Sequence, residues 1–335
     1  MRVTILGAGI AGLTCALELH ERGAVVEVLE RAPQLAGAGC SWFAGGMLAP
    51  WCERESSPAL IAELGTESLS WWRDHFAGTA QEGTLVVAHA RDTGELAQFA
   101  RRTAHFENVS ADTLAALEPE LAGRFSQGLH FPEEGHLDPR AALGALLARL
   151  GELGVPIQFG CGVAVPRPGR VLLDCRGLAA HAELSDLRGV KGEMLLLRLP
   201  ELQLTRPVRL LHPRWPLYVV PRGEGLFMVG ATMLESEDGA RISARSMLEL
   251  LSAAYALHPA FGEAQVIEIG VGVRAAFPDN LPRLRHVGGV LHVNGLYRHG
   301  FLLAPALARR AAGVLLEGRH YAEVMDEDPG QRRLA

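Results

Sequence analysis

Residues 1–30, MRVTILGAGIAGLTCALELHERGAVVEVLE, set a glycine-rich turn between apolar runs. The pattern predicts a short buried strand at 2–6, a helix at 13–22 and a second strand at 25–29. This order is the βαβ unit that opens many dinucleotide-binding sheets. Charged residues interrupt the helix and no small-residue cleavage site follows, so the stretch does not resemble a secretory signal.

Three glycines in this stretch have G-x-G-x-x-G spacing. Gly7 permits a tight turn, Gly9 lets the backbone approach a pyrophosphate, and Gly12 lets the helix pack closely on the strand. The free N–H groups at the helix start favour a bound phosphate. Glu30 follows the second strand, where a carboxylate can accept the ribose hydroxyls of an adenosine. The spacing also occurs in other glycine-rich turns, but the strand, the helix and the acidic strand end together predict a dinucleotide site.

Length and composition bound the class of protein. A chain of 335 residues can hold one large domain or two intertwined domains. A hydrophobic content of 48% and a charged content of 21% are ordinary for a globular protein, and no apolar run reaches the length of a membrane span. The formal charge of −6 gives no reason to expect a nucleic-acid partner. We therefore expect a cytoplasmic protein that binds neither nucleic acid nor membrane.

The cysteine and lysine content bears on possible disulfides, metal sites and charged surfaces. The five cysteines are odd in number and lack C-x-x-C spacing, so they indicate neither a disulfide framework nor a zinc site, and we expect no bound metal. Reduced, mostly buried thiols fit this usage. Lys191 is the single lysine among 32 basic residues, and the arginines are scattered rather than clustered.

The rest of the chain alternates predicted strands and helices. Residues 37–50, GAGCSWFAGGMLAP, are too rich in small residues for a long helix and either line a bulky cofactor or form a flexible loop. Trp71 and Trp72 lie in an amphipathic helix, and we expect them in the core. The predicted helices lie at 58–75, 93–103, 111–117, 138–153, 244–257 and 305–316. The predicted strands lie at 83–90, 157–165, 170–175, 193–199, 217–220, 226–229, 266–273 and 290–294.

The order of these elements predicts the fold class. Strand, loop and helix at both chain ends suggest that both termini belong to one Rossmann-like cofactor domain of α/β type. The alternating apolar runs after Gly192 suggest a second, mainly antiparallel-sheet α+β domain that binds the substrate. We therefore expect a discontinuous cofactor domain and a substrate domain. The expected cofactor domain comprises 1–80, 137–180 and 271–335, and the substrate domain comprises 81–136 and 181–270.

Three polar residues late in the chain lie in apolar, glycine-rich surroundings. They are Tyr218 in PLYVVPR, Arg274 in GVGVRAAFP and Arg298 in NGLYRHGFLLAP. An arginine at the end of an apolar strand is costly to bury without a partner, and its planar fork suits bidentate capture of a carboxylate. A tyrosine hydroxyl can add a third hydrogen bond. Each residue alone also fits a snorkelling surface side chain or half of a structural ion pair, and the residues by themselves leave both interpretations open.

Several motifs follow one another in the order typical of one family. They are the N-terminal fingerprint, AGGML at 44–48, YVVPR…VGATM at 218–233, GVR at 272–274 and GLYRHGFLLAP at 295–305. The chain resembles the flavin-dependent amino-acid oxidases of the D-amino-acid oxidase group and, within it, the glycine oxidases of bacterial thiamine biosynthesis. Many flavoproteins share the fingerprint, whereas VGATM and the last motif are far more specific. The resemblance spans nearly the whole chain.

The resemblance implies that the Rossmann-like domain is of the glutathione-reductase-like type and holds FAD non-covalently. The residues implied to bind the ADP half are Gly7, Ala8, Gly9, Ile10, Ala11, Gly12, Glu30 and Arg31, with Val163 at the adenine and Arg176 and Gly177 near the cofactor. Those implied to lie along the flavin ring are Ser41, Gly45, Gly46, Met47, Arg298, His299, Gly300, Phe301 and Leu302. The last five lie in the turn before a predicted helix, and the backbone N–H groups and the helix N-terminus there would stabilise negative charge on the reduced ring.

The resemblance also implies the substrate site and the reaction. Arg274 would bind the substrate carboxylate, with Tyr218 and Arg298 assisting and Met233 lining the pocket. These catalytic-site residues would hold Cα–H at flavin N5, so that hydride transfer gives an imine and reduced flavin without a side-chain acid or base. Oxygen would then reoxidise the flavin and yield hydrogen peroxide. The implied partners are a small amino acid and O₂, and the resemblance suggests a homo-oligomer.

The sequence departs from the family pattern at three places. Pro216 stands where close relatives carry histidine, His299 where asparagine is common, and Asp174-Cys175-Arg176-Gly177 where Ala-Thr-Gly is usual. These departures leave the implied reaction type unchanged. They weaken any inference about the size of the substrate.

Three other functions stay open at this stage. A secondary-amine oxidase of the sarcosine oxidase type often attaches flavin through cysteine and uses a lysine near N5, but Lys191 lies far in sequence from the flavin motifs. A dehydrogenase would pass electrons to a quinone or carrier instead of oxygen. A non-catalytic flavoprotein would not need Tyr218, Arg274 and Arg298 together. Pocket volume decides among glycine, sarcosine and small D-amino acids, and the sequence does not give it.

Overall fold

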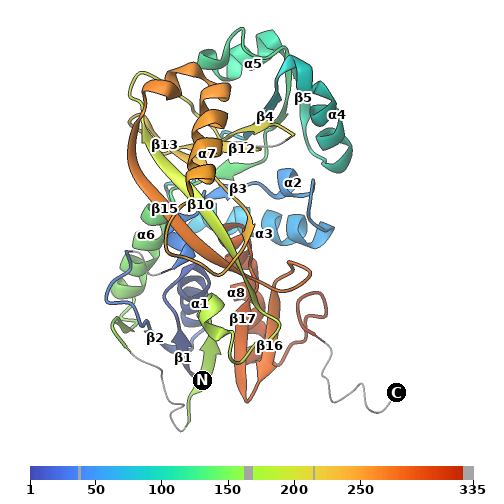
Figure 1. Cartoon of the computed structure of the whole chain (residues 1–335). Coiled ribbons are helices and arrows are strands. Elements are labelled where there is room, and N and C mark those ends of the chain that lie inside the picture. The colour runs from blue at the N-terminus through green and yellow to red at the C-terminus, as the bar shows by residue number, and fades with distance from the viewer. Residues whose placement is uncertain (37–38, 162–168, 214–215, 327–335) are drawn as a thin grey trace.

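The computed structural model describes residues 1–36, 39–161, 169–213 and 216–326. Among these residues the strands form a six-stranded sheet, a nine-stranded sheet and a two-stranded ladder. Figure 1 shows the six-stranded sheet in the lower part of the molecule and most of the nine-stranded sheet in the upper part. The predicted class, an α/β cofactor fold joined to a mainly antiparallel second region, is confirmed. The exact domain boundaries stay a prediction.

The six-stranded sheet is built around the N-terminal strand. Its strands are, in spatial order, β16 (Arg283–Val287), β17 (Val290–Asn294), β9 (Val171–Asp174), β1 (Arg2–Leu6), β2 (Val25–Leu29) and β8 (Ile157–Gln158). All pair in parallel except the β16–β17 hairpin. Leu6 at the end of β1 pairs with Leu29 on one side and Asp174 on the other. Because these strands run in parallel, the residues that follow them converge at one edge of the sheet.

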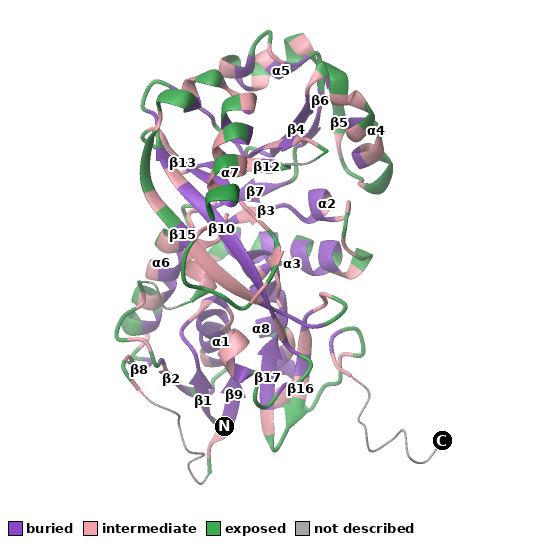
Figure 2. Ribbon diagram, in the orientation of Figure 1, coloured by how far each residue is buried: buried purple, intermediate pink, exposed green. Residues whose placement is uncertain are grey.

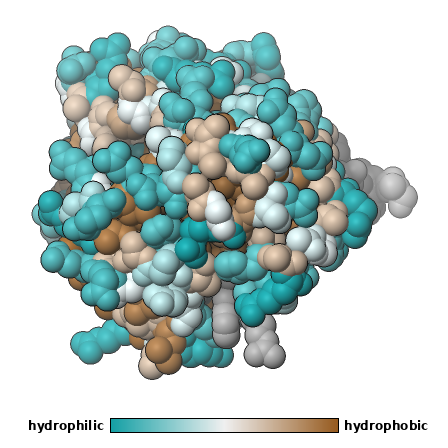
Figure 3. All heavy atoms as spheres, turned by 90° about the horizontal axis from the view of Figure 1, so that it is seen from above, coloured by the Kyte–Doolittle hydropathy of each residue, from teal (hydrophilic) through white to brown (hydrophobic). Residues whose placement is uncertain are grey.

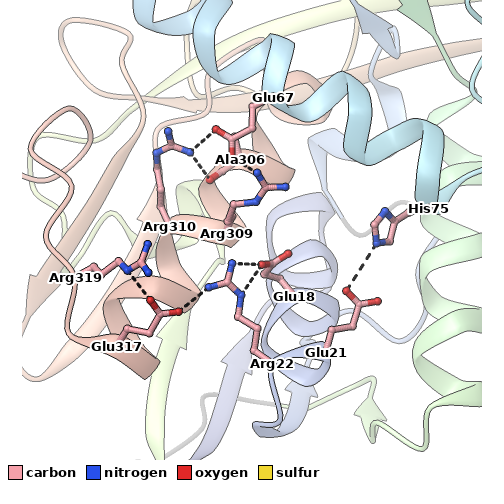
Figure 4. Close-up of polar contacts among 10 residues, drawn as sticks. All are labelled: Glu18, Glu21, Arg22, Glu67, His75, Ala306, Arg309, Arg310, Glu317 and Arg319. Carbon is pink, nitrogen blue, oxygen red and sulfur yellow. Dashed lines mark hydrogen bonds and ion pairs between the residues drawn. The ribbon is translucent and has the colours of Figure 1, made fainter.

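Four helices pack around this sheet, namely α1 (Ile10–Glu21), α3 (Ala59–His75), α6 (Pro139–Glu152) and α8 (Gly300–Glu317). Trp71 and Trp72 of α3 are buried, as predicted. Ion pairs link the outer surfaces of α1, α3 and α8 (Figure 4). Arg22 at the end of α1 contacts Glu18 and Glu317, and Arg310 of α8 contacts Glu67 of α3. Because such exposed or half-buried ion pairs contribute little free energy, the apolar core supplies most of the stability of this helix packing.

The predicted start of the last helix is wrong. The sequence pattern put Pro305 in its first turn, but α8 begins at Gly300 and Pro305 lies inside it. A proline has no N–H for the carbonyl of the residue four positions earlier, here Phe301. The Trp72 indole N–H donates to that Phe301 oxygen over 2.7 Å. A side chain from α3 therefore satisfies the acceptor that the proline leaves free, and the helix continues through it.

The nine-stranded sheet carries the other half of the fold. Its strands are β14 (Leu234–Glu235), β10 (Arg188–Arg198), β13 (Leu226–Gly230), β12 (Leu217–Pro221), β11 (Val208–Leu211), β4 (Thr84–Ala88), β6 (Gln127–Phe131) and β5 (Glu107–Ser110), with β15 (Gln265–Ala276) paired to β10. The pairing is antiparallel except between β11 and β4. A short ladder joins β3 (Met47–Leu48) to β7 (Gly135–His136). The sheet is therefore mainly antiparallel, as expected.

Two long strands connect the two parts of the molecule. β10 and β15 pair along their whole length and run from the upper part toward the six-stranded sheet (Figure 1). Figure 2 shows β10 buried over most of its length, because elements cover both of its faces. Strand β15 carries Arg274, which pairs with Val190 of the neighbouring strand β10. The two strands thus carry substrate-region residues to the edge of the cofactor sheet.

The remaining elements confirm most of the pattern and correct some of it. The other helices are α2 (Pro50–Glu53), α4 (Thr93–Arg102), α5 (Ala111–Leu117) and α7 (Ala244–Leu257), and α7 has the predicted bounds. The predicted strand at 157–165 is wrong at residues 159–161, which are irregular, and its residues 162–165 lie outside the described residues. Seven strands were not predicted, because each is short and only partly alternating: β3, β5, β6, β7, β11, β14 and β16.

Among the described residues, no helix combines the length and the apolar character that crossing a bilayer requires. Seen from above, the molecule presents mainly hydrophilic residues with small, separated hydrophobic areas (Figure 3).

Candidate active site

The edge formed by β1, β2 and β9 brings the predicted nucleotide-binding residues together. Gly7 has a φ of +100°, and a Cβ there would lie 2.8 Å from the Cys175 carbonyl oxygen. A Cβ at Gly12 would lie 1.9 Å from the Gly7 carbonyl oxygen. Gly9 is the N-cap of α1 and has no side chain to cap the helix. Ile10 N donates to Ser41 Oγ over 3.3 Å, and the N–H groups of Ala11 and Gly12 are available to an anion. Close backbone packing therefore requires glycine at positions 7 and 12, whereas a Cβ at Gly9 would meet only Ser41 Oγ at 3.5 Å.

Glu30 lies beside this turn with its carboxylate nine-tenths buried. Its Oε2 accepts a hydrogen bond from Ala8 N over 2.7 Å, and its Oε1 accepts one from Ala32 N over 2.8 Å. Each carboxylate oxygen retains a further lone pair. Gly7, Gly9 and Glu30 line one cavity of about 540 Å³. The site thus presents helix N–H groups and a carboxylate acceptor to the same space, as an adenosine diphosphate needs.

The other residues predicted to bind the nucleotide differ in how free they are to contact a ligand. Arg31 and Gly177 line the same cavity. The Arg176 side chain also lines it, but Nε donates to Asp174 Oδ2 over 2.9 Å and Nη2 to Glu183 Oε1 over 2.9 Å. Arg176 is therefore held by Asp174 and Glu183, and its backbone N–H also donates to Asp174 Oδ1 over 2.9 Å. Val163 lies outside the described residues.

A narrow cavity of about 80 Å³ links the nucleotide end to the second half of the site. It shares Cys40, Ser41 and Phe43 with the nucleotide cavity. It shares Gly45, Tyr218, Arg274, Arg298 and Gly300, among others, with a larger cavity of about 630 Å³. The three cavities therefore lie in a row, and this row suits an elongated group such as a dinucleotide with a ring system at its far end.

The larger cavity collects most of the remaining predicted residues. Those that line it are Gly45, Gly46, Met47, Tyr218, Met233, Arg274, Arg298, His299, Gly300, Phe301 and Leu302. They come from β3, β12, β15, the turn before α8 and the loop that follows β13. Segments more than two hundred residues apart in sequence meet here, which explains why no single motif predicts the site.

Tyr218 and Arg274 form the most available polar pair in this cavity. Arg274 Nη1 donates to the Thr232 carbonyl oxygen over 3.0 Å, which fixes one end of the guanidinium. Burial raises the pKa of the Tyr218 hydroxyl, although the Arg274 charge acts in the opposite direction. Tyr218 is therefore a neutral hydrogen-bond donor beside a fixed cation, which is a suitable arrangement for a carboxylate.

Arg298 is bound more tightly than the sequence suggested. Its Nη2 lies 2.7 Å from Glu53 Oε2 and 2.6 Å from Ser56 Oγ. Its Nη1 donates to Met233 Sδ over 3.4 Å, and Met233 is half-exposed. Arg298 thus reaches the cavity wall while an ion pair anchors one of its nitrogens.

Glu53 and Arg209 are site residues that the sequence analysis missed. Burial raises the pKa of Glu53, but the Arg298 and Arg209 charges outweigh burial and hold that pKa well below its usual range. Burial lowers the pKa of His299 to about 3 despite the nearby Glu53 charge, so its imidazole is neutral. Neither Glu53 nor Arg209 lies in a recognisable motif, and no sequence signal links residues 156 positions apart.

The start of α8 completes the cavity. His299 is the N-cap of the helix and its side chain does not cap it. His299, Gly300, Phe301 and Leu302 all line the cavity, so unpaired N–H groups of the first turn lie at its wall. A helix N-terminus favours negative charge there. Among the described residues, no group of three or more His, Cys, Asp or Glu side chains could hold a metal ion.

A nucleotide-binding sheet edge joined by a row of cavities to an arginine-lined chamber defines an oxidoreductase that uses a dinucleotide cofactor. The family model for FAD dependent oxidoreductases matches residues 2–313, and the chain belongs to this family. Its cofactor is therefore FAD. The glycine turn, the Glu30 carboxylate and the helix N-terminus of α8 all fit that group.

Three relatives show the range of similarity within the family. A Rhizobium etli protein, provisionally named a thiamine biosynthesis oxidoreductase, is 55% identical over 94% of this chain and 97% of its own length. A glycine oxidase of Pseudomonas aeruginosa is 28% identical over 95% of both chains. The crystal structure of glycine oxidase from Geobacillus kaustophilus has a TM-score of 0.78 and 23% identity, with 96% of both chains covered. The last similarity supports the fold alone.

Proposed function

We propose that this protein is an FAD-dependent oxidase of glycine or a small amino acid, acting in thiamine (thiazole) biosynthesis in the cytoplasm. The observation that carries the proposal is the pair Tyr218 and Arg274 on the wall of the narrow cavity that leads to the nucleotide end. A neutral phenol and a cation at this position suit the carboxylate of an amino acid. The similarity to glycine oxidases and to the R. etli protein favours glycine and this pathway.

The reaction we propose removes two electrons and two hydrogens from the amine. The Cα–H bond breaks with its electron pair, the amine loses a proton, and the product is an imine that water converts to a 2-oxo acid and ammonia. Bound FAD supplies the two-electron acceptor, and O₂ takes the electrons with two protons to give H₂O₂. The flavin would be held without a covalent bond.

The protein's own part is positioning and electrostatics. Arg274 and Tyr218 would fix the substrate carboxylate, so that one face of the substrate Cα is turned toward the cofactor. The free N–H groups at the start of α8 would stabilise negative charge that develops on the cofactor side. No proton transfer by a side chain is needed if the amine is neutral when it reacts.

The sarcosine-oxidase alternative is not favoured. Lys191 is nine-tenths buried on β10, where Nζ lies 3.3 Å from Glu193 Oε1 and donates to the Arg241 carbonyl oxygen over 2.5 Å. It lines none of the three cavities described above. Lys191 therefore does not serve as the lysine near the flavin that the sarcosine oxidase type uses. Sarcosine is still expected as a side substrate of the proposed enzyme.

The visible spectrum of the purified holoprotein, taken anaerobically, tests the proposal. Two flavin bands that bleach on addition of glycine and return with air would support the cofactor, the substrate and oxygen together. Bleaching by D-alanine but not glycine would overturn the substrate. Bleaching that air does not reverse, but that a quinone does, would replace the oxidase with a dehydrogenase.

A further inference from the structure

Arg209 begins a line of alternating charges behind the cavity wall. Its Nη2 contacts Glu53 Oε1. The other carboxylate oxygen, Glu53 Oε2, lies 2.7 Å from Arg298 Nη2. That nitrogen in turn lies 2.6 Å from Ser56 Oγ. The sequence of contacts therefore runs from a strand of the large sheet, through α2, to the turn before α8.

The pairing of strands β11 and β12 places the Arg209 side chain at the large cavity. In the antiparallel pair β11–β12, Arg209 lies directly opposite Tyr218. Directly opposite residues of two paired strands have their side chains on the same face of the sheet. Arg209 and Tyr218 accordingly line the same cavity. Arg209 is thus part of the substrate chamber although no motif marks it.

The burial of Glu53 decides how this line of charges acts. Glu53 lines the large cavity, but its Oε2 is fully buried beside Arg298. Arg298 is the more open partner, with 24% of its side chain exposed against 11% for Glu53. We therefore expect an effect of Glu53 on the substrate to pass mainly through Arg298.

Arg209 supplies the second positive charge that this buried carboxylate needs. The charged or titratable groups that interact with Glu53 include Arg209, Arg298, His299, Cys52 and Tyr218. Of these five groups the two arginines are the cations, since the imidazole of His299 is neutral. Without Arg209, a single arginine would remain to balance a desolvated carboxylate, which is a costly arrangement.

We propose, on the basis of the function proposed above, that Arg209 is a positioning residue for substrate binding. Through Glu53 it fixes the Arg298 guanidinium at the cavity wall. A fixed arginine has already lost the rotamer freedom that a free one must lose on binding a carboxylate. Arg209 therefore sets the affinity of the site for the carboxylate by holding Arg298, although its own side chain also lines the cavity.

The test compares wild-type holoenzyme with Arg209→Met and Arg209→Lys. Two quantities are measured: KM and kcat for the amine that the wild type oxidises, and the Kd of acetate from its perturbation of the flavin spectrum. Freeing one long side chain costs up to about 2 kcal/mol, so for Arg209→Met we expect KM and the acetate Kd to rise by about tenfold. We expect kcat to change little and Arg209→Lys to restore most of the affinity, because the charge is retained.

A double substitution identifies the route. If Arg209 acts through Arg298, then Arg209→Met has almost no further effect on acetate binding in an Arg298→Met background. Independent action would multiply the two effects and would overturn the proposed route. Glu53→Gln, which keeps the shape but removes the charge, should reproduce the loss seen in Arg209→Met and serves if that variant does not fold.

Arg206 provides a matched control. It forms a comparable buried ion pair with Glu118, at 2.9 Å, just before the same strand, but it lines no cavity described above. Arg206→Met should lower the melting temperature and leave KM and the acetate Kd unchanged. If Arg209→Met behaves in the same way, its role is structural and the inference is wrong.

The acetate measurement separates this inference from the proposed function. A wild type that binds acetate while Arg209→Met binds it equally well overturns the inference alone. A wild type that neither bleaches with any amino acid nor binds acetate overturns the proposed function, and the inference with it. A tenfold loss in Arg209→Met that disappears in the Arg298→Met background supports both.

Discussion

Gly192 lies directly beneath the guanidinium group of Arg274. A Cβ at position 192 would come within 2.3 Å of Arg274 Nη2 and 2.4 Å of its Cζ. Gly192 pairs with Gly272 across β10 and β15, two residues before Arg274. The guanidinium can therefore lie flat over β10 only because position 192 has no side chain. A glycine in a long buried strand is costly, and its presence here indicates that close approach is needed.

This relationship predicts that Gly192→Ala weakens substrate binding without unfolding the protein. The added methyl group must displace the arginine head from the Thr232 carbonyl oxygen, since the head is the movable partner. We expect the KM of the oxidised amine to rise by about tenfold or more, a loss comparable to that of a hydrogen bond to a charged group. Gly144→Ala in α6, where a Cβ meets open space, is the matched control and should leave KM unchanged. Equal KM values for both variants would mean that Arg274 is not held in this position when substrate binds.

Removing the arginine itself should have a larger effect. Arg274→Ala would leave a substrate carboxylate poorly paired in a dry cavity, at a cost on the order of 3–5 kcal/mol. We expect kcat/KM to fall by about a hundredfold at least, with the flavin spectrum of the resting enzyme unchanged. Steady-state kinetics with the preferred amine measures the loss. A near-normal kcat/KM would place the carboxylate site elsewhere in the cavity.

The sequence predicted the parts of this protein whose physical causes are local. The turn from Gly7 to Gly12 has no room for a Cβ at its first and last positions, and this need lies within a short stretch of sequence. Helix α8 was misjudged because its continuation through Pro305 depends on a hydrogen bond from Trp72, more than two hundred residues away in sequence. Such a partner is visible only after folding.

The candidate site shows the same limit. Tyr218, Arg274 and Arg298 were found because each stands in an unusual apolar setting and matches a family motif. Glu53 and Arg209 have no such setting: the first lies in a charged stretch and the second in a short, partly alternating strand. Their importance comes from the contact between them, which spans 156 positions. A contact between the end of α2 and a strand of the large sheet arises only when the chain has folded, so the sequence alone does not reveal it.

Glu30 offers a test of the nucleotide end. Both of its carboxylate oxygens accept backbone N–H groups, from Ala8 and Ala32, while facing the cavity. Glu30→Gln would point an NH₂ group at one of these donors and remove the charge that binds ribose hydroxyls. We expect FAD affinity to fall by about tenfold or more, as for loss of a hydrogen bond to a charged group. Reconstitution of the apoprotein with FAD, followed by flavin fluorescence, measures this change.

The control for this prediction lies on the same strand. Glu27 of β2 is also buried, accepts a hydrogen bond from Thr4 and pairs with Arg170, but it does not line the nucleotide cavity. Glu27→Gln should reduce stability and leave FAD affinity unchanged. Equal affinities for the two variants would contradict a direct role for Glu30.

Glu134 should make stability depend on pH in a direction opposite to that of most carboxylates. It is fully buried in the turn between β6 and β7, where Oε1 accepts a hydrogen bond from Cys52 N over 2.7 Å. Burial raises its pKa to about 7 from 4.5, although Thr84 and the Cys52 N–H favour the ionised form. Between these two values the folded protein holds a proton that the unfolded chain has lost. The free energy of unfolding must therefore fall as the pH rises through this window.

Replacing Glu134 by glutamine should remove that dependence. A shift of this size corresponds to about 3 kcal/mol, so the stability of Glu134→Gln relative to wild type should be greater by about this amount at pH 8 than at pH 5. Thermal unfolding of both proteins at the two pH values measures the difference, and taking the difference cancels all other titrating groups. The neighbouring Glu133 has 59% of its side chain exposed, and Glu133→Gln is the control for which no pH-dependent change is expected. A constant stability difference for Glu134→Gln across this range would show that the Glu134 carboxyl is already ionised at pH 5, with its charge balanced by the nearby Arg209.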